Sequence, residues 1–198
     1  MPVPTRHATL IRTGQRVENC CPALAALYPI ACKLCPEGFP AEETTELDAL
    51  REHVSLALVG ALRREVSAKT GIPLEWLSLD RFTLHGCGPV SLHDDRHNYP
   101  GVYFVIIVVH AGQLGVVDAT SRARRHEVGE ILLLDPHKKH ALVPEGLTAR
   151  EHRYERTHSP VLRDQERFMF VGFDVRRPLL RDWFRPSTVG VRNCVEAG

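Results

Sequence analysis

Short apolar runs separated by turn residues make up most of the sequence after Pro73, and this pattern constrains the fold more than any other feature. Each run has five to eight residues, a length typical of β-strands rather than helices. Turn residues such as Gly86, Pro100 and Pro136 lie between the runs. The runs are residues 81–85, 90–95, 102–109, 114–118, 130–134, 139–143 and 168–175. So many short runs with few helical intervals predict an all-β sandwich or barrel.

The run at residues 102–109 differs from the others because all eight of its residues are apolar. A strand with one face in water would alternate apolar and polar residues. We therefore expect both faces of this strand to be covered, one by an opposing sheet and the other by a helix. The run is also too short to cross a bilayer as a helix.

One strongly amphipathic pattern precedes the runs, at residues 45–70. Leucine and valine recur there at spacings of three or four residues, which predicts a helix. Thr45 and Asp48 fit an N-terminal capping pair, and Gly71 is suited to end the helix. Because its apolar stripe must be buried, we expect this helix to pack on the predicted sheet.

The remaining segments carry weaker patterns. Residues 23–30 favour a short helix, whereas the rest of residues 1–42 looks irregular. The poorly patterned stretch at residues 145–166 predicts a long loop that would serve as a lid over the substrate. Residues 178–184 predict one or two helical turns. We expect a single structural domain in which residues 1–77 form a helical cover on a catalytic core of residues 78–198.

Size and charge exclude several classes of protein. The chain has 198 residues, 43% of them hydrophobic and 25% charged, as in ordinary globular proteins. Its net charge is +1, so binding driven by bulk positive charge, to nucleic acid or to an anionic membrane, is not expected. The N-terminal residues lack the basic-then-apolar pattern of a secretory signal. We therefore predict a cytoplasmic protein whose six cysteines are mostly free thiols.

The segment around His93 and Asp95 carries the most chemistry. On a strand, residues two apart point to the same face, so this imidazole and this carboxylate are expected side by side. Together they make two-thirds of a 2-His-1-carboxylate triad, the donor set that holds Fe(II) and leaves positions open for oxygen and substrate. A later histidine must complete it, and His137 and His140 are the candidates. We favour His140 because it begins a predicted strand, whereas His137 lies in the preceding turn.

These features resemble the Fe(II)/2-oxoglutarate-dependent oxygenases, whose fold is a double-stranded β-helix, also called a jelly roll. The resemblance covers roughly residues 78–176 and rests on the His93-x-Asp95 pair, the apolar strand after it and the strand, turn and strand that lead to His140. It also rests on Arg167, which opens the last predicted strand. The resemblance implies a mainly β, cupin-like jelly roll in which His93, Asp95 and His140 bind Fe(II).

The same resemblance implies a co-substrate site and a reaction. Arg167 would pair with the distal carboxylate of 2-oxoglutarate, because a planar guanidinium binds a carboxylate through two parallel hydrogen bonds. The usual family spacing would instead select Arg150. The Tyr103 hydroxyl is a further candidate contact to the co-substrate. Oxidative decarboxylation of 2-oxoglutarate to succinate would accompany hydroxylation or demethylation of a small molecule, an amino acid or a protein side chain.

Two other classes of protein remain open. A cupin-type metalloprotein would use His93, His97 and His140 without 2-oxoglutarate, and a metal-free β-sandwich would serve as an interaction module. Oligomeric state has no signature in the sequence.

The remaining histidines, cysteines and phenylalanines have simpler interpretations. Phe168 and Phe170 are expected to share a face that packs away from the active-site pocket. Adjacent cysteines diverge and make a poor ligand pair, so free thiols are favoured over a structural zinc site. That zinc site would comprise Cys20, Cys21, Cys32 and Cys35, and the histidines expected at the surface or in loops are His97, His110, His126, His152 and His158.

Overall fold

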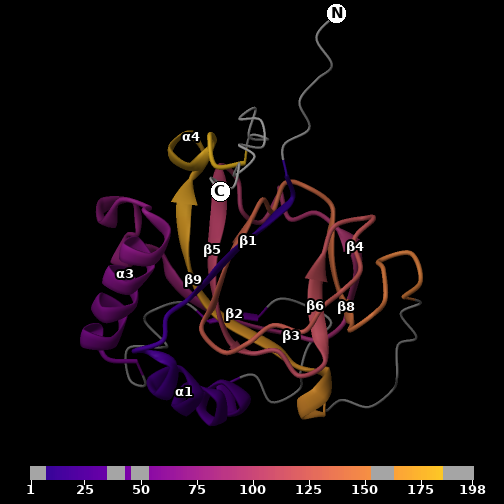
Figure 1. Ribbon diagram of the computed structural model, residues 1–198, viewed down its shortest axis with the longest axis horizontal. Helices are drawn as coiled ribbons and strands as arrows, with labels where there is room; N and C mark the ends of the chain where they lie inside the picture. The colour runs from indigo at the N-terminus through magenta and orange to yellow at the C-terminus, as the bar shows by residue number, and fades with distance from the viewer. Residues whose placement is uncertain (1–7, 35–42, 46–53, 153–162, 185–198) are drawn as a thin grey trace, which may run out of the picture.

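Two antiparallel β-sheets form the centre of the computed structural model, which describes residues 8–34, 43–45, 54–152 and 163–184 (Figure 1). The six-stranded sheet has the order β1-β7-β5-β9-β3-β2, and the three-stranded sheet has the order β4-β8-β6. The strands of the larger sheet are β1 (Leu10–Arg16), β7 (Glu130–Leu134), β5 (Val102–His110), β9 (Phe168–Arg176), β3 (Phe82–Cys87) and β2 (Glu43–Thr45). Those of the smaller sheet are β4 (Val90–His93), β8 (His140–Pro144) and β6 (Leu114–Val117).

All seven strands predicted after Pro73 are present, and the prediction of a mainly β protein is confirmed. Strands β1 and β2 were not expected. Strand β1 carries polar residues and Gly14, whose φ is 70°, and its pairing with β7 shifts register between Arg12 and Arg16. Because both strands belong to the six-stranded sheet, residues 1–77 supply part of the core sheet and not only a cover.

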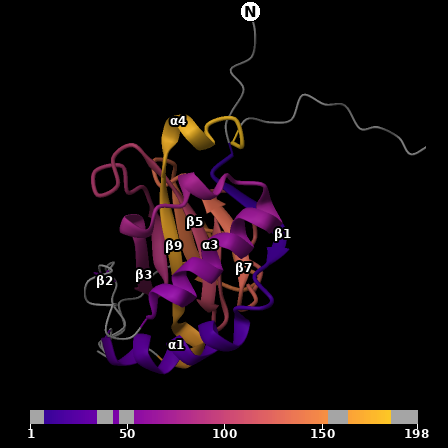
Figure 2. The same cartoon turned by 90° about the vertical axis from the view of Figure 1, so that its left-hand side faces the viewer.

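Helix α3 (Leu56–Thr70) covers the outer face of the six-stranded sheet, and α1 (Cys21–Leu34) runs across the lower end of that face, as Figure 2 shows. Helix α3 begins later than predicted, because the Ser55 hydroxyl accepts a hydrogen bond from the Leu58 amide and caps the helix. The expected cap residue, Thr45, lies in β2 instead. The predicted end is confirmed by Gly71, whose left-handed φ of 76° suits glycine.

Short helical segments connect or follow the strands. They are η1 (Leu74–Trp76), η2 (Leu79–Arg81), η3 (Asp164–Glu166) and α4 (Arg177–Leu180), the last at the predicted C-terminal helical turn. Residues 153–162 lie outside the described residues, so the expected lid is not described. None of the described helices combines the length and apolar character needed to cross a lipid bilayer.

Strand β5 is buried on both faces, as its sequence predicted. Alternate residues such as Val105 and Ile107 pack with α3 residues in the core between the large sheet and the helices. The intervening residues, including Phe104 and Ile106, pack toward the three-stranded sheet. The six-stranded sheet is therefore the middle layer of three, and the space on its inner side holds the candidate site.

Candidate metal centre

His93, Asp95 and His140 come together at one end of the three-stranded sheet. His93 and His140 are directly opposite each other in the antiparallel pairing of β4 with β8. Asp95 follows β4, and its amide donates a 2.7 Å hydrogen bond to the Pro136 carbonyl in the turn before β8. Two backbone connections thus bring the three side chains together, as the sequence predicted.

The possible ligand atoms of this triad all lie within 4.8 Å of one another. Oδ2 of Asp95 is 3.2 Å from Nε2 of His140 and 3.5 Å from Nε2 of His93. Asp95 and His140 are buried, whereas the side chain of His93 is 31% exposed. Within the described residues, no other group of three histidine, cysteine, aspartate or glutamate side chains meets in this way.

Both imidazoles are held through their other ring nitrogen. Nδ1 of His93 is 2.7 Å from the Ser91 carbonyl, and Nδ1 of His140 is 2.8 Å from the Lys138 carbonyl. A carbonyl can only accept, so Nδ1 carries the proton in each ring, and in the neutral form Nε2 keeps a lone pair directed at the centre of the triad. Metal-binding histidines commonly have this arrangement, because the backbone bond fixes both the tautomer and the ring orientation.

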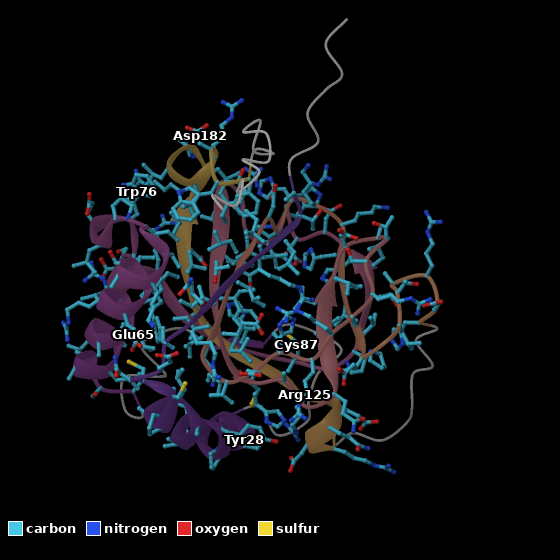
Figure 3. All side chains as sticks on the ribbon, viewed as in Figure 1. Tyr28, Glu65, Trp76, Cys87, Arg125 and Asp182 are labelled. Carbon is cyan, nitrogen blue, oxygen red and sulfur yellow. The ribbon has the colours of Figure 1, made fainter. Side chains whose placement is uncertain are left out.

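The triad borders a cavity of about 360 Å³ between the two sheets. Its walls are largely apolar, with Phe104, Phe168 and Phe170 among them, and Cys87, labelled in Figure 3, also lines it. None of the described residues that line the cavity is lysine or arginine. Such walls suit a ligand that is mostly apolar near the triad.

His85 also lines this cavity, and sequence reasoning missed it. Its ring stacks on Phe170 at 4.4 Å, and its Nε2 is 2.8 Å from the Thr83 hydroxyl. Burial lowers the pKa of His85 to about 4, although the negative charge of Asp95 opposes the shift. His85 is therefore neutral near pH 7. The period of two along β3, which places Thr83, His85 and Cys87 on one face, could have indicated it.

The orientation expected for β9 is wrong. Phe168 and Phe170 do share a face, but this face lines the cavity, whereas Met169 belongs to the core under the helices. The expectation failed because strand alternation groups residues by face without saying which face meets which layer.

Arg167 is buried beside the start of β9 and is not among the cavity-lining residues, and Arg150 is exposed.

Tyr103 lies on the opposite side of the six-stranded sheet from the cavity. Its ring stacks on Phe184 with centroids 4.1 Å apart, and the Arg177 guanidinium lies 4.2 Å above it. The neighbouring residues Phe104 and Ile106 face the cavity instead, and the contact between the Tyr103 hydroxyl and a co-substrate stays a prediction.

The other histidines do not join the triad. His97 is exposed, which argues against a three-histidine site, and Nε2 of His137 is 3.0 Å from the Tyr99 carbonyl. His126, expected at the surface or in a loop, lies in the loop before β7 with its side chain buried, and its Nδ1 is 2.9 Å from Oε2 of Glu130. His158 lies outside the described residues.

The three described cysteines of the N-terminal region are not gathered into a site. Cys20 is buried, Cys21 and Cys32 are half-buried, and all three are free thiols. Cys21 and Cys32 lie eleven residues apart on α1, which is about 16 Å along a helix and too far for one zinc ion. Cys35 lies outside the described residues.

Comparison with known proteins gives no relative: no model of a known protein family matches the chain, and no curated protein matches it. Function must therefore be argued from the site itself.

Proposed function

We propose that the protein is a non-haem Fe(II)- and 2-oxoglutarate-dependent dioxygenase. The observation that carries the proposal is the convergence of His93 Nε2, His140 Nε2 and Asp95 Oδ2 at the wall of the cavity between the sheets. Two imidazoles and one carboxylate suit Fe(II) and leave adjacent coordination positions open. The substrate would be a small molecule, an amino acid or a protein side chain that undergoes hydroxylation or demethylation.

The strand order supports a jelly-roll architecture. From β3 to β9, successive strands alternate between the six-stranded and the three-stranded sheet. This alternation winds the chain around the space between the sheets, as a double-stranded β-helix does. It brings β4 and β8 next to each other, although more than forty residues separate His93 from His140 in the sequence.

The residues of the chain would hold the metal and shield it. A bound Fe(II) would supply oxygen activation, with 2-oxoglutarate oxidised to succinate and carbon dioxide as one oxygen atom enters the substrate. Asp95 would place a negative charge beside the metal, and the Nδ1 bonds would keep both imidazoles aimed at it. The aromatic walls would exclude water and orient the substrate.

The experiment that tests the proposal is anaerobic addition of 2-oxoglutarate to the Fe(II)-loaded protein, followed by admission of oxygen. Chelation of Fe(II) by the 2-oxo acid is expected to produce a visible charge-transfer absorption, and oxygen is expected to yield succinate. Asp95→Ala should abolish both signals. Asp94→Ala is the matched control, because Asp94 pairs with Arg96 rather than with the triad. An Fe(II)-loaded wild-type protein that gives neither signal would contradict the proposal.

A further inference from the structure

A continuous row of aromatic rings runs along one wall of the metal cavity. Tyr99 meets Phe104 edge-on with ring centroids 4.6 Å apart, and Phe104 is 5.7 Å from His85. His85 stacks on Phe170 at 4.4 Å, and Phe170 is 5.9 Å from Phe168. All five residues line the cavity, and they are called the aromatic row below.

The six-stranded sheet holds most of this row in place. Phe104 lies on β5, Phe170 on β9 and His85 on β3, and these strands are neighbours in the sheet. His85 and Phe170 are directly opposite each other in the pairing of β3 with β9, so their stacking is a cross-strand contact. Because adjacent strands fix the rings, a ligand that enters the cavity would meet a preformed wall.

The aromatic row begins beside the metal centre. The amide of Tyr99 donates a 2.9 Å hydrogen bond to the carbonyl of Asp95. Burial lowers the pKa of His85 and the negative charge of Asp95 acts on it in the opposite direction, so these two side chains lie within electrostatic range of each other. A group held on the row would therefore share the cavity with the three possible metal ligands.

The walls of the cavity offer little to a charged ligand. Among the described lining residues there is no lysine or arginine, and Asp95 is the one carboxylate. Its Oδ2 faces the triad, 3.2 Å from Nε2 of His140. His85 is neutral near pH 7 because it is buried. Burial of an unpaired charge is strongly unfavourable, so the described walls select an uncharged group away from the triad.

We propose that the aromatic row binds an uncharged aromatic ring of the substrate and holds it beside the metal centre. Aromatic rings attract one another in stacked or edge-on arrangements at distances close to those within the row, so a further ring would extend the same pattern. A cavity of about 150 Å³ is enough to bind benzene. The volume of about 360 Å³ therefore leaves room for one ring beside a small co-substrate. The inference rests on the proposed function in taking the metal centre as the site where this substrate is oxidised.

Four probes with the same ring size test the selection. Phenol is neutral and aromatic, cyclohexanol is neutral and saturated, benzoate is an anion, and benzylamine is a cation at pH 7. Their affinities for the metal-free protein, measured by ligand-observed NMR titration, do not depend on the proposed function. With Mn(II)-loaded protein, paramagnetic broadening of the probe signals that Zn(II) does not cause reports whether the ring binds near the triad.

The ring has two possible sources, a small molecule or the side chain of a peptide. A capped glycine-phenylalanine-glycine peptide, compared with its leucine analogue, presents the same ring on an uncharged chain. Tighter binding of this peptide than of phenol assigns the ring to a peptide substrate, and weaker binding assigns it to a small molecule.

Two variants alter the row or fill the cavity without touching the triad. Phe170→Leu keeps an apolar side chain but removes a ring, and it should weaken phenol binding about threefold to tenfold. Val90→Phe adds a ring at a position that lines the cavity, and it should weaken phenol binding at least about tenfold. Phe173→Leu is the matched control, because Phe173 lies on the same strand and faces the helix-covered core, and phenol affinity should stay within twofold. Thermal denaturation verifies that each variant is folded.

We expect the wild-type protein to bind phenol about threefold more tightly than cyclohexanol and at least about tenfold more tightly than benzoate or benzylamine. Equal affinities for phenol and any of the other three probes would overturn the inference. Phenol binding that neither Phe170→Leu nor Val90→Phe weakens, or that shows no broadening by bound Mn(II), would overturn it as well. A wild-type protein that binds no metal would refute the proposed function, while the metal-free titrations would still decide what the aromatic row binds.

Discussion

The two faces of the six-stranded sheet use the same strands for opposite purposes. On the face under the helices, Val105, Ile107 and Phe173 are fully buried in a continuous apolar core. On the other face, Phe104 and Phe170 border a cavity that also contains His85 and the metal-ligand triad. Strand alternation alone separates the core residues from the residues that border the cavity, because successive side chains point to opposite faces.

The two faces show where the chain stabilises its fold and where it leaves room for chemistry. A close-packed face contributes stability through burial and dispersion, and a hollow face gives up part of that contribution. Polar groups such as His85 and Asp174 lie on the hollow side of the sheet, where His85 is buried and Asp174 is half-buried. Mutations on the two faces should therefore affect different properties.

Phe173→Ala and Phe170→Ala compare the same residue type on opposite faces of one strand. Phe173 is fully buried and contacts Phe82 with ring centroids 5.0 Å apart, so its truncation should lower the free energy of unfolding by about 4 kcal/mol. Phe170 already borders a cavity, so its truncation should cost about 2 kcal/mol. Urea denaturation measures both, and equal losses would contradict the distinction between the faces.

His140→Ala should remove metal binding while leaving the helix-covered core intact. The loss of one of three ligands should weaken affinity for Fe(II) or Mn(II) by at least about 100-fold, roughly 3 kcal/mol. His137→Ala is the matched control, since His137 lies in the turn before β8 and contacts the Tyr99 carbonyl. Anaerobic titration monitored by electron paramagnetic resonance of Mn(II) measures the affinities. A similar loss of metal affinity in both variants would show that the substitutions disturb the turn before β8 and do not report on metal binding by His140.

Asp174→Asn should change the pH dependence of stability. Burial raises the pKa of Asp174 to about 6, partly opposed by Arg81, and its Oδ1 has no hydrogen-bond partner among the described residues. The folded state thus holds the proton more tightly than the unfolded state, whose ordinary pKa is about 3.9, and stability falls as pH rises through 6.

The free energy of unfolding of Asp174→Asn should therefore exceed that of the wild type by about 1–2 kcal/mol at pH 8 and by almost nothing at pH 4, after allowance for partial solvent screening. Thermal or urea unfolding at the two pH values provides the measurement. A variant equally stabilised or destabilised at both values would show that the buried carboxyl does not titrate as described.

Tyr103→Phe should have the smallest effect on the site. The ring would keep its stacking on Phe184, and the hydroxyl faces away from the cavity. Affinity for 2-oxoglutarate in the Fe(II)-loaded protein should stay within twofold of wild type. A tenfold loss would mean that this residue reaches the co-substrate after all.

The strands and the triad could be predicted from the sequence because their signals are local. A continuous apolar run marks β5, and His93-x-Asp95 combines with a histidine that begins the later strand β8. Strand β1 escaped prediction because its polar residues give no alternation, and it exists through pairing with the distant β7.

The orientation of faces could not be predicted for a related reason. Alternation correctly separates Tyr103 from Phe104 and Met169 from Phe170, but only tertiary packing decides which set the helices cover. The later start of α3 likewise depends on Ser55, whose capping bond outweighs a capping pair that is equally plausible in sequence.

A crystal structure of the protein grown anaerobically with Fe(II), or with Mn(II) in its place, would show which side chains bind the metal. We predict one ion bound by Nε2 of His93, Nε2 of His140 and the Asp95 carboxylate, at distances of about 2.1 Å, with its open positions facing the cavity between the sheets. A fully loaded crystal in which the ion lies elsewhere, or in which these three side chains remain hydrogen-bonded to one another without it, would contradict the account.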